Sequence, residues 1–201
     1  MTAQPQPQEQ GTPVAPLRFY DFRAEGAGFM ADVLAGFSAR HKFIPPRWFF
    51  DAEGARLYAA LAEAPECYAE RSELAILRAH AAEALELAGP DAQFMAFGAG
   101  GLAAIRHLIA QLRPALHLQI DTDAAAAGVA LKSLLAVFPS LNMAAIIADA
   151  SQHLVLPEFV GASIRKKAAF MPGWTLGSLA PDELYATLQQ TRRMLGAGGV
   201  L

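Results

Sequence analysis

The spacing of hydrophobic residues changes near residue 90 of this chain. Before that point, apolar residues recur at helical spacings and prolines interrupt them. The pattern predicts a strand or loop and then a helix up to about residue 40, a helix over 55–63, and a longer helix over about 71–87. The triplet GPD at 89–91 ends the last of these. The first part of the chain is therefore expected to be mainly helical.

After residue 90, short apolar runs alternate with amphipathic stretches. The run QFMAF is typical of a buried strand, and the apolar residues of the next segment share one helical face: Ile105, Leu108, Ile109 and Leu112. Strands are predicted at 93–97, 115–121, 142–149 and 166–171, and helices at 103–112, 124–138 and 181–195. This alternation predicts an α/β fold, with a parallel Rossmann-like sheet that carries helices on both faces.

The same pattern divides the chain into three parts. Residues 1–16 are rich in Gln and Pro and poor in apolar side chains, so we expect a disordered tail there. Residues 17–90 form the mainly helical segment, and residues 91–201 form the sheet domain. A fifth strand only begins in the final GAGGVL, so the last strands of the sheet are expected to be missing.

The composition limits the kinds of partner that this protein is expected to bind. The formal net charge is −3, which gives no general attraction to nucleic acid or to an anionic membrane. No apolar run approaches the roughly 20 residues of a membrane span. The single cysteine cannot form an internal disulfide, and the N-terminus does not resemble a signal peptide, so a cytoplasmic protein with a small-molecule ligand is expected. The five histidines lack metal-ligand spacing, and no metal site is predicted.

A glycine-rich turn and two aspartates follow successive predicted strands. Gly98 and Gly100 come after the first strand, while Asp121 ends the second and Asp149 ends the third. In such folds ligands bind beyond the carboxyl ends of the strands, and an acid about 20 residues after the glycines can accept hydrogen bonds from ribose hydroxyls. Ala103 replaces the third glycine of the dinucleotide fingerprint, so the pattern favours an adenosyl nucleoside over a dinucleotide. A purely structural turn remains an alternative.

Several of these conspicuous residues also have a structural interpretation. Asp121 could cap the following helix, although the sequence DTDAAAAG also allows Asp121 to bind ribose while Asp123 caps. The aromatic residues WFF after the double proline are expected to form a packing anchor. Cys67 is read as a small buried residue, because no histidine or asparagine constellation accompanies it.

Five segments taken together resemble one methyltransferase family. They are IPPRWFFDAEGARLYAALAEAPECYAERSELAIL, FMAFGAGG, IDTD, AVFPSLNMAAIIADASQHL and PGWTLGSLAPDEL. From about Phe43 to Leu201 the chain is similar to the histidine-specific, S-adenosylmethionine-dependent methyltransferases, which include the Nα-methyltransferases of ergothioneine biosynthesis. The most specific part is a PP.WF.D..G..L block followed by P..Y..R.E..IL. The resemblance implies S-adenosyl-L-methionine as cofactor and a methyltransferase-type sheet.

The resemblance implies roles for five residues on the cofactor side. Gly98 and Gly100 would lie against the methionine and ribose, Asp121 would bind the ribose hydroxyls, and Asp149 would meet the adenine amino group. Arg106, in the helix after the glycine turn, is also predicted to bind the cofactor. No catalytic side chain is predicted, because the sulfonium is already activated and the protein mainly aligns an amine with the methyl carbon.

On the substrate side, the helical segment is predicted to contribute to the pocket, and four residues would border the acceptor: Phe50, Tyr68, Thr175 and Ser178. The chain departs from the family pattern at several of these places. Phe50 and Cys67 stand where the family commonly has tyrosines, and Ser178 replaces an asparagine. In the cofactor turn, Ala96 and Ala99 replace an acid and a hydroxyl.

The resemblance implies an N-methyltransferase acting on the α-amino group of histidine or a related amino acid. The family's chains continue beyond the position of Leu201, so a protein partner that covers the incomplete sheet is also expected. Two alternatives remain open. One is a non-catalytic, degenerate or truncated relative that acts through protein contacts, and the other is a fragment of a nicotinamide-dependent oxidoreductase.

Overall fold

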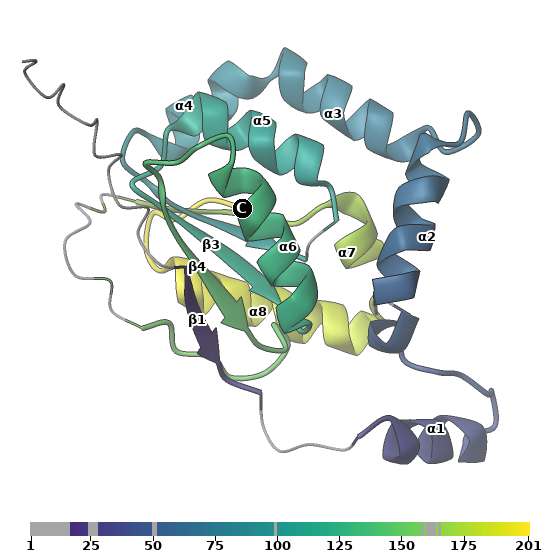
Figure 1. The fold of residues 1–201 in the computed structure, drawn as a ribbon. Coiled ribbons are helices and arrows are strands. Elements are labelled where there is room, and N and C mark those ends of the chain that lie inside the picture. The colour runs from purple at the N-terminus through teal and green to yellow at the C-terminus, as the bar shows by residue number, and fades with distance from the viewer. Residues whose placement is uncertain are drawn as a thin grey trace, which may run out of the picture.

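The computed structural model describes residues 17–23, 28–49, 52–98, 100–157, 159, 164 and 166–201. Its core is a parallel five-stranded sheet with the strand order β1-β4-β3-β2-β5 (Figure 1). The strands are β1 (Arg18–Asp21), β2 (Gln93–Phe97), β3 (Leu116–Asp121), β4 (Asn142–Ile147) and β5 (Lys167–Phe170). The expected α/β fold with a parallel sheet is confirmed. The predicted tail lies outside the described residues.

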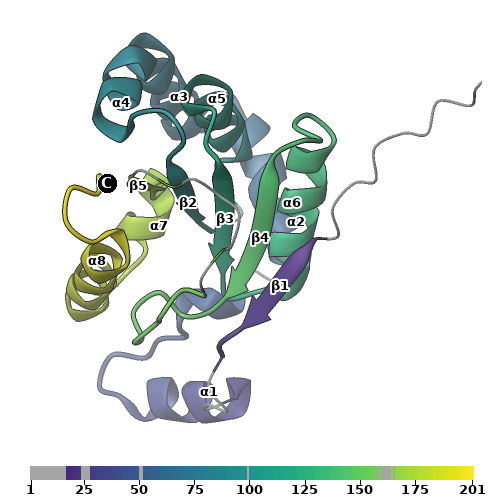
Figure 2. The same cartoon turned by 90° about the vertical axis from the view of Figure 1, so that its left-hand side faces the viewer.

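Helices cover both faces of this sheet (Figure 2). They are α1 (Phe29–Ser38), the 3₁₀ helix η1 (Pro46–Phe49), α2 (Ala52–Glu63), α3 (Ala69–Ala79), α4 (Ala81–Ala88), α5 (Leu102–Leu112), α6 (Ala124–Leu135), α7 (Gly173–Gly177) and α8 (Pro181–Leu195). α5 and α6 pack on one face, and α3 and α4 pack against α5. α8 packs on the opposite face. No described helix is long and apolar enough to cross a membrane.

The sequence pattern of β2 explains why this strand lies at the centre of the core. All five of its residues are buried. Phe94 and Ala96 belong to the apolar cluster under α5 and α6, whereas Met95 and Phe97 belong to the cluster under α8. A strand buried on both faces reads as a continuous apolar run. The apolar face predicted for α5 is likewise buried.

One strand comes from the segment predicted to be mainly helical. The sequence allowed either a strand or a loop after Leu17, and the structure forms β1, which pairs with β4 at the edge of the sheet. β1 is short and largely exposed, so its sequence carries little of the apolar signal that marks a buried strand. The sheet therefore extends across the predicted boundary at residue 90.

The predicted helix over residues 71–87 is wrong in one respect, since it is two helices. His80 leaves helical geometry with φ −114° and ψ 16°, so the chain bends between α3 and α4. Each of the two helices packs against α5. The apolar spacing continues across the bend because both helices face the same neighbour, so periodicity alone did not reveal it.

The topology creates a crevice at the carboxyl ends of the strands. β2 pairs with β3 on one side and with β5 on the other, so the strand order reverses at β2. This is the position where ligands bind in open parallel sheets. Beyond β5, Val200 forms a parallel bridge with Ala168, and its amide donates to the Lys167 carbonyl at 3.0 Å. Pairing thus begins where the sequence predicted a fifth strand.

Candidate active site

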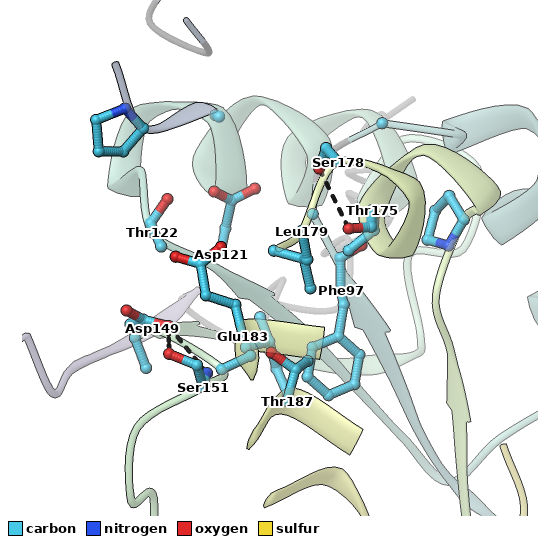
Figure 3. Close-up of a pocket in the computed structure, with 18 of the residues that line it drawn as sticks. Phe97, Asp121, Thr122, Asp149, Ser151, Thr175, Ser178, Leu179, Glu183 and Thr187 are labelled. Carbon is cyan, nitrogen blue, oxygen red and sulfur yellow. Dashed lines mark hydrogen bonds between the residues drawn. The ribbon is translucent and has the colours of Figure 1, made fainter. Parts of the chain in front are cut away.

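A cavity of about 300 Å³ lies at this edge of the sheet (Figure 3). This volume falls within the range of ligand pockets, at its lower end. The strand ends contribute Phe97, Gly98, Gly100, Ile120, Asp121, Thr122, Ala148, Asp149, Ala150 and Ser151. The surrounding helices and loops contribute Pro45, Tyr58, Ala126, Pro172, Thr175, Ser178, Leu179, Glu183 and Thr187. The cavity therefore joins the carboxyl ends of β2, β3 and β4 to side chains from both helical layers.

The glycine turn after β2 forms the floor of the cavity. Gly98 has φ +76°, in the left-handed region where side chains are strained. Its amide donates to the Ile120 carbonyl at 2.8 Å, and its carbonyl accepts from Nε2 of Gln119 at 2.6 Å. A Cβ at Gly98 would lie 3.5 Å from Oγ1 of Thr175. The absence of side chains here keeps the space between β2 and α7 open.

Alanine substitutions at Gly98 and Gly100 should distinguish backbone strain from steric crowding by the added methyl group. We expect Gly98→Ala to lower the free energy of unfolding by about 1 kcal/mol and Tm by about 3 °C. The reason is that the Cβ of alanine is strained in the left-handed backbone conformation of this position. Gly100→Ala should change Tm little, since its Cβ would lie 3.8 Å from Cε1 of Tyr58, an ordinary contact. Thermal unfolding of both variants measures the difference. Equal Tm values would contradict the strain assigned to Gly98.

Two aspartates at the end of β3 have different environments. Oδ1 of Asp121, which lines the cavity, accepts a hydrogen bond from the Asp123 amide at 2.9 Å. Asp123 instead caps α6, because its Oδ1 accepts from the amides of Ala125 and Ala126 at 2.7 and 3.3 Å. The division expected from the sequence, with Asp123 as the cap, agrees with this geometry. The Asp121 side chain forms part of the wall of the cavity.

The end of β4 repeats this local arrangement. Oδ1 of Asp149 accepts from the Ser151 amide at 2.9 Å and from Oγ of Ser151 at 2.7 Å. Both residues line the cavity. The two hydrogen bonds hold one carboxylate oxygen, which fixes the orientation of the group. Asp121 and Asp149 thus present two anchored carboxylates, one at the end of β3 and one two residues beyond the end of the neighbouring parallel strand β4.

The lining also carries hydroxyl groups from α2, from α7 and from Ser178 just after α7. The Tyr58 hydroxyl donates to Oε1 of Glu70 at 2.6 Å. Burial raises the pKa of Tyr58, and the bond to Glu70 raises it further, so the phenol stays protonated. Ser178 donates to the Thr175 carbonyl at 3.3 Å and stabilises the end of α7. These side chains bring neutral hydroxyl groups to the cavity, in contrast to the carboxylates of the strand ends.

Three residues with predicted roles are not brought to the cavity or cannot be placed. Arg106 does not line it, because its guanidinium donates to Oγ of Ser133 on α6. Tyr68 does not line it either, since its side chain is 73% exposed just before α3. Phe50 lies outside the described residues. The structure thus brings six of the predicted residues together: Gly98, Gly100, Asp121, Asp149, Thr175 and Ser178.

Sequence reasoning missed several residues of the cavity. Tyr58 and Glu183 both line it, and the Glu183 carboxylate also accepts from the Ala180 amide at 3.1 Å at the start of α8. A signal for Ser151 was present, since a strand-end aspartate commonly accepts a hydrogen bond from the amide two residues later. Tyr58 sits on one face of a predicted helix, and helical spacing alone does not say which face meets the sheet.

The histidine-specific, S-adenosylmethionine-dependent methyltransferase family matches residues 29–201. This match covers most of the chain and includes the whole cavity. The chain belongs to this family. The histidine N-alpha-methyltransferase of Mycolicibacterium smegmatis is 34% identical over 167 residues, which cover 80% of this chain and 50% of the relative. The enzyme of the same name from Mycobacterium tuberculosis is 30% identical over 164 residues, covering 78% of this chain and 50% of the relative.

Membership of the histidine-specific methyltransferases decides among the alternatives left open by the sequence. It excludes the nicotinamide-dependent oxidoreductase and gives no support to the non-catalytic relative. The chain spans about half the length of the curated relatives it matches. Within the described residues, no group of His, Cys, Asp and Glu could hold a metal ion.

The cavity fits the cofactor of the family, S-adenosyl-L-methionine. The open space beside Gly98 suits a close approach of the ligand to the main chain, because a Cβ there would point at Thr175. The two anchored carboxylates can accept hydrogen bonds from ribose hydroxyls and from an exocyclic amine. The lining also includes the apolar side chains of Ile120 and Leu179. The hydrogen-bond acceptors and the apolar side chains of the lining therefore match the groups of a nucleoside.

Proposed function

We propose that this chain binds S-adenosyl-L-methionine in the cavity and methylates the α-amino group of histidine. Asp121 binds the ribose hydroxyls, Asp149 binds the adenine amino group, and the turn at Gly98 and Gly100 lies against the remaining part of the cofactor. The observation that carries the proposal is the arrangement of two anchored aspartates beside the glycines Gly98 and Gly100. The names of both relatives support histidine as the acceptor.

The reaction requires alignment more than acid or base chemistry. When bound, the cofactor would supply a methyl group on a positively charged sulfur, which the lone pair of a neutral amine could take up. The amine has lost a proton before the transfer, and the methylated product carries the positive charge. The chain has to hold the acceptor in line and exclude water. We assign acceptor contacts to Thr175 and Ser178, which line the wall opposite the aspartates.

Two measurements test the proposal. Calorimetric titration with S-adenosylhomocysteine should show binding, and incubation with labelled S-adenosyl-L-methionine and a panel of amino acids should label histidine. Nα-acetylhistidine is the matched control, because its imidazole is free while its α-amine is blocked. Labelling of the acetylated compound would contradict the α-amino assignment. Binding without transfer to any amino acid would favour the non-catalytic alternative, and folded protein that binds no S-adenosylhomocysteine would contradict the proposal.

A pathway and a cellular location were also predicted from the sequence. Ergothioneine biosynthesis as the pathway and the cytoplasm as the location stay predictions. The expected protein partner that covers the edge of the sheet also stays a prediction.

A further inference from the structure

A buried glutamine lies directly beneath the glycine turn. Gln119 is fully buried in β3, and its Nε2 donates to the Gly98 carbonyl at 2.6 Å. The next residue of the same strand, Ile120, accepts the Gly98 amide at 2.8 Å. Both main-chain polar groups of Gly98 are therefore held by two consecutive residues of β3. β2 ends at Phe97, so the regular ladder of the sheet does not fix the Gly98 carbonyl.

The side chain of Gln119 shares a face of the sheet with Asp121. Side chains alternate along a strand, and Leu118 and Ile120 belong to the cluster under α8. Gln119 and Asp121 therefore lie on the opposite face, which α5 and α6 cover. One strand thus carries both the group that holds the turn and the carboxylate of the nucleoside pocket.

Glutamine is an unfavourable choice for this position on stability grounds alone. Oε1 of Gln119 has no hydrogen-bond partner among the described residues. Burial lowers the pKa of His117, two residues earlier on the same face, and its interaction with the Gln119 side chain acts in the opposite direction. A buried polar atom without a partner costs roughly 1–3 kcal/mol. The adjacent residues of this strand, Leu118 and Ile120, are apolar but point to the other face. An apolar side chain of similar size in place of Gln119 would avoid the cost of the unpartnered oxygen.

We propose that Gln119 is a positioning residue, whose amide fixes the Gly98 carbonyl and so sets the glycine turn relative to Asp121. Because Gln119 is buried, it acts on the ligand only through the turn. This inference rests on the proposed binding of S-adenosyl-L-methionine in the cavity. It adds a residue that neither the sequence motifs nor the lining of the cavity includes.

The chain offers a matched control for a test by substitution. Gln190 on α8 is also buried, its Nε2 donates to the Leu154 carbonyl at 2.7 Å, and its Oε1 likewise lacks a partner in the described structure. Gln119→Met and Gln190→Met therefore remove the same kind of hydrogen bond on opposite faces of the sheet. Gln119→Asn serves as a second variant, because it keeps a buried amide that is too short to reach Gly98.

The first readout is the affinity for S-adenosylhomocysteine, measured by calorimetry beside thermal unfolding. We expect Gln119→Met and Gln119→Asn to bind S-adenosylhomocysteine roughly tenfold more weakly than the parent, which is the effect of one lost hydrogen bond. Gln190→Met should lower Tm, while its affinity stays within about twofold of that of the parent. Parent-like affinity in both Gln119 variants would overturn the inference. An equal loss of affinity in Gln190→Met would also overturn it, because the effect would then follow stability rather than position.

The second readout needs no ligand. Amide hydrogen exchange at Gly98 should be faster in both Gln119 variants than in the parent, whereas Gln190→Met should leave it unchanged. Unchanged exchange at Gly98 in the Gln119 variants would overturn the inference by itself. A parent protein that binds no S-adenosylhomocysteine contradicts the proposed function and, with it, a role for Gln119 toward the cofactor. A parent that binds while its Gln119 variants bind equally well contradicts the role of Gln119 alone.

Discussion

Replacing Asp121 by alanine should weaken the binding of S-adenosylhomocysteine by at least about 100-fold, the loss expected for two hydrogen bonds to a charged group. The carboxylate lies at the wall of the cavity, at the end of β3, where it can accept from both ribose hydroxyls. Calorimetric titration of the parent and the variant measures the change directly. The effect should be large because no other described acid of the cavity lies at the end of the same strand.

Asp123→Ala is the matched control for this experiment. Asp123 lies two residues after Asp121 and caps the N-terminus of α6. Its loss should lower the free energy of unfolding by about 1 kcal/mol and leave the affinity for S-adenosylhomocysteine within about twofold of that of the parent. Asp121→Asn adds a second comparison, since an amide oxygen can still accept from the Asp123 amide and preserve the turn. If Asp123→Ala weakened binding as much as Asp121→Ala, the ribose would not be bound by Asp121 in particular.

The second large effect concerns the dependence of stability on pH. His117 is fully buried in β3, and burial lowers the pKa of its imidazole from 6.5 to about 4. The ring therefore stays neutral in the fold between these pH values, whereas in the unfolded chain it takes up a proton. The unfolded state binds more protons in this window, so the free energy of unfolding falls as the pH is lowered from 6.5 to 4. The total loss from this group is about 3 kcal/mol.

Urea denaturation of the parent and of His117→Leu at several pH values tests this expectation. Above pH 6.5 the difference in stability between the two proteins should be constant. Between pH 6.5 and 4, the parent should lose about 3 kcal/mol more than the variant. Parallel pH profiles would show that His117 can take up a proton within the fold and would contradict the assigned shift.

The sheet and its glycine turn could be predicted because their signals are local. A strand buried on both faces, such as β2, is a continuous apolar run, and the turn after it is marked by glycines that the left-handed backbone requires. Parallel topology then places Asp121 and Asp149 at one edge without any knowledge of the packing. These features follow from the spacing of hydrophobic residues, from the residue types that form turns and from the direction of the strands, all of which can be inferred from the sequence.

The helical walls of the cavity could not be predicted in the same way. Arg106 follows the glycine turn by only a few residues, yet its position on α5 directs it toward Ser133. Tyr68 belongs to a specific sequence block, but it precedes α3 on the solvent side. Tyr58 lines the cavity because of how α2 is placed against the rest of the fold. Such placements depend on packing between distant segments, which periodicity does not encode.

The cavity is built from two sources that are separate along the chain. Its nucleoside side consists of the ends of β2, β3 and β4, where main-chain groups and anchored aspartates leave little freedom for change. The rest of its lining comes from the helices α2, α6, α7 and α8 and from nearby loops, none of which takes part in the ladder of the sheet. Substitutions in those helices and loops can change the shape of the cavity without touching the hydrogen bonds of the strand ends. In this chain the two parts of the cavity can therefore be changed separately, because they depend on different segments of the sequence.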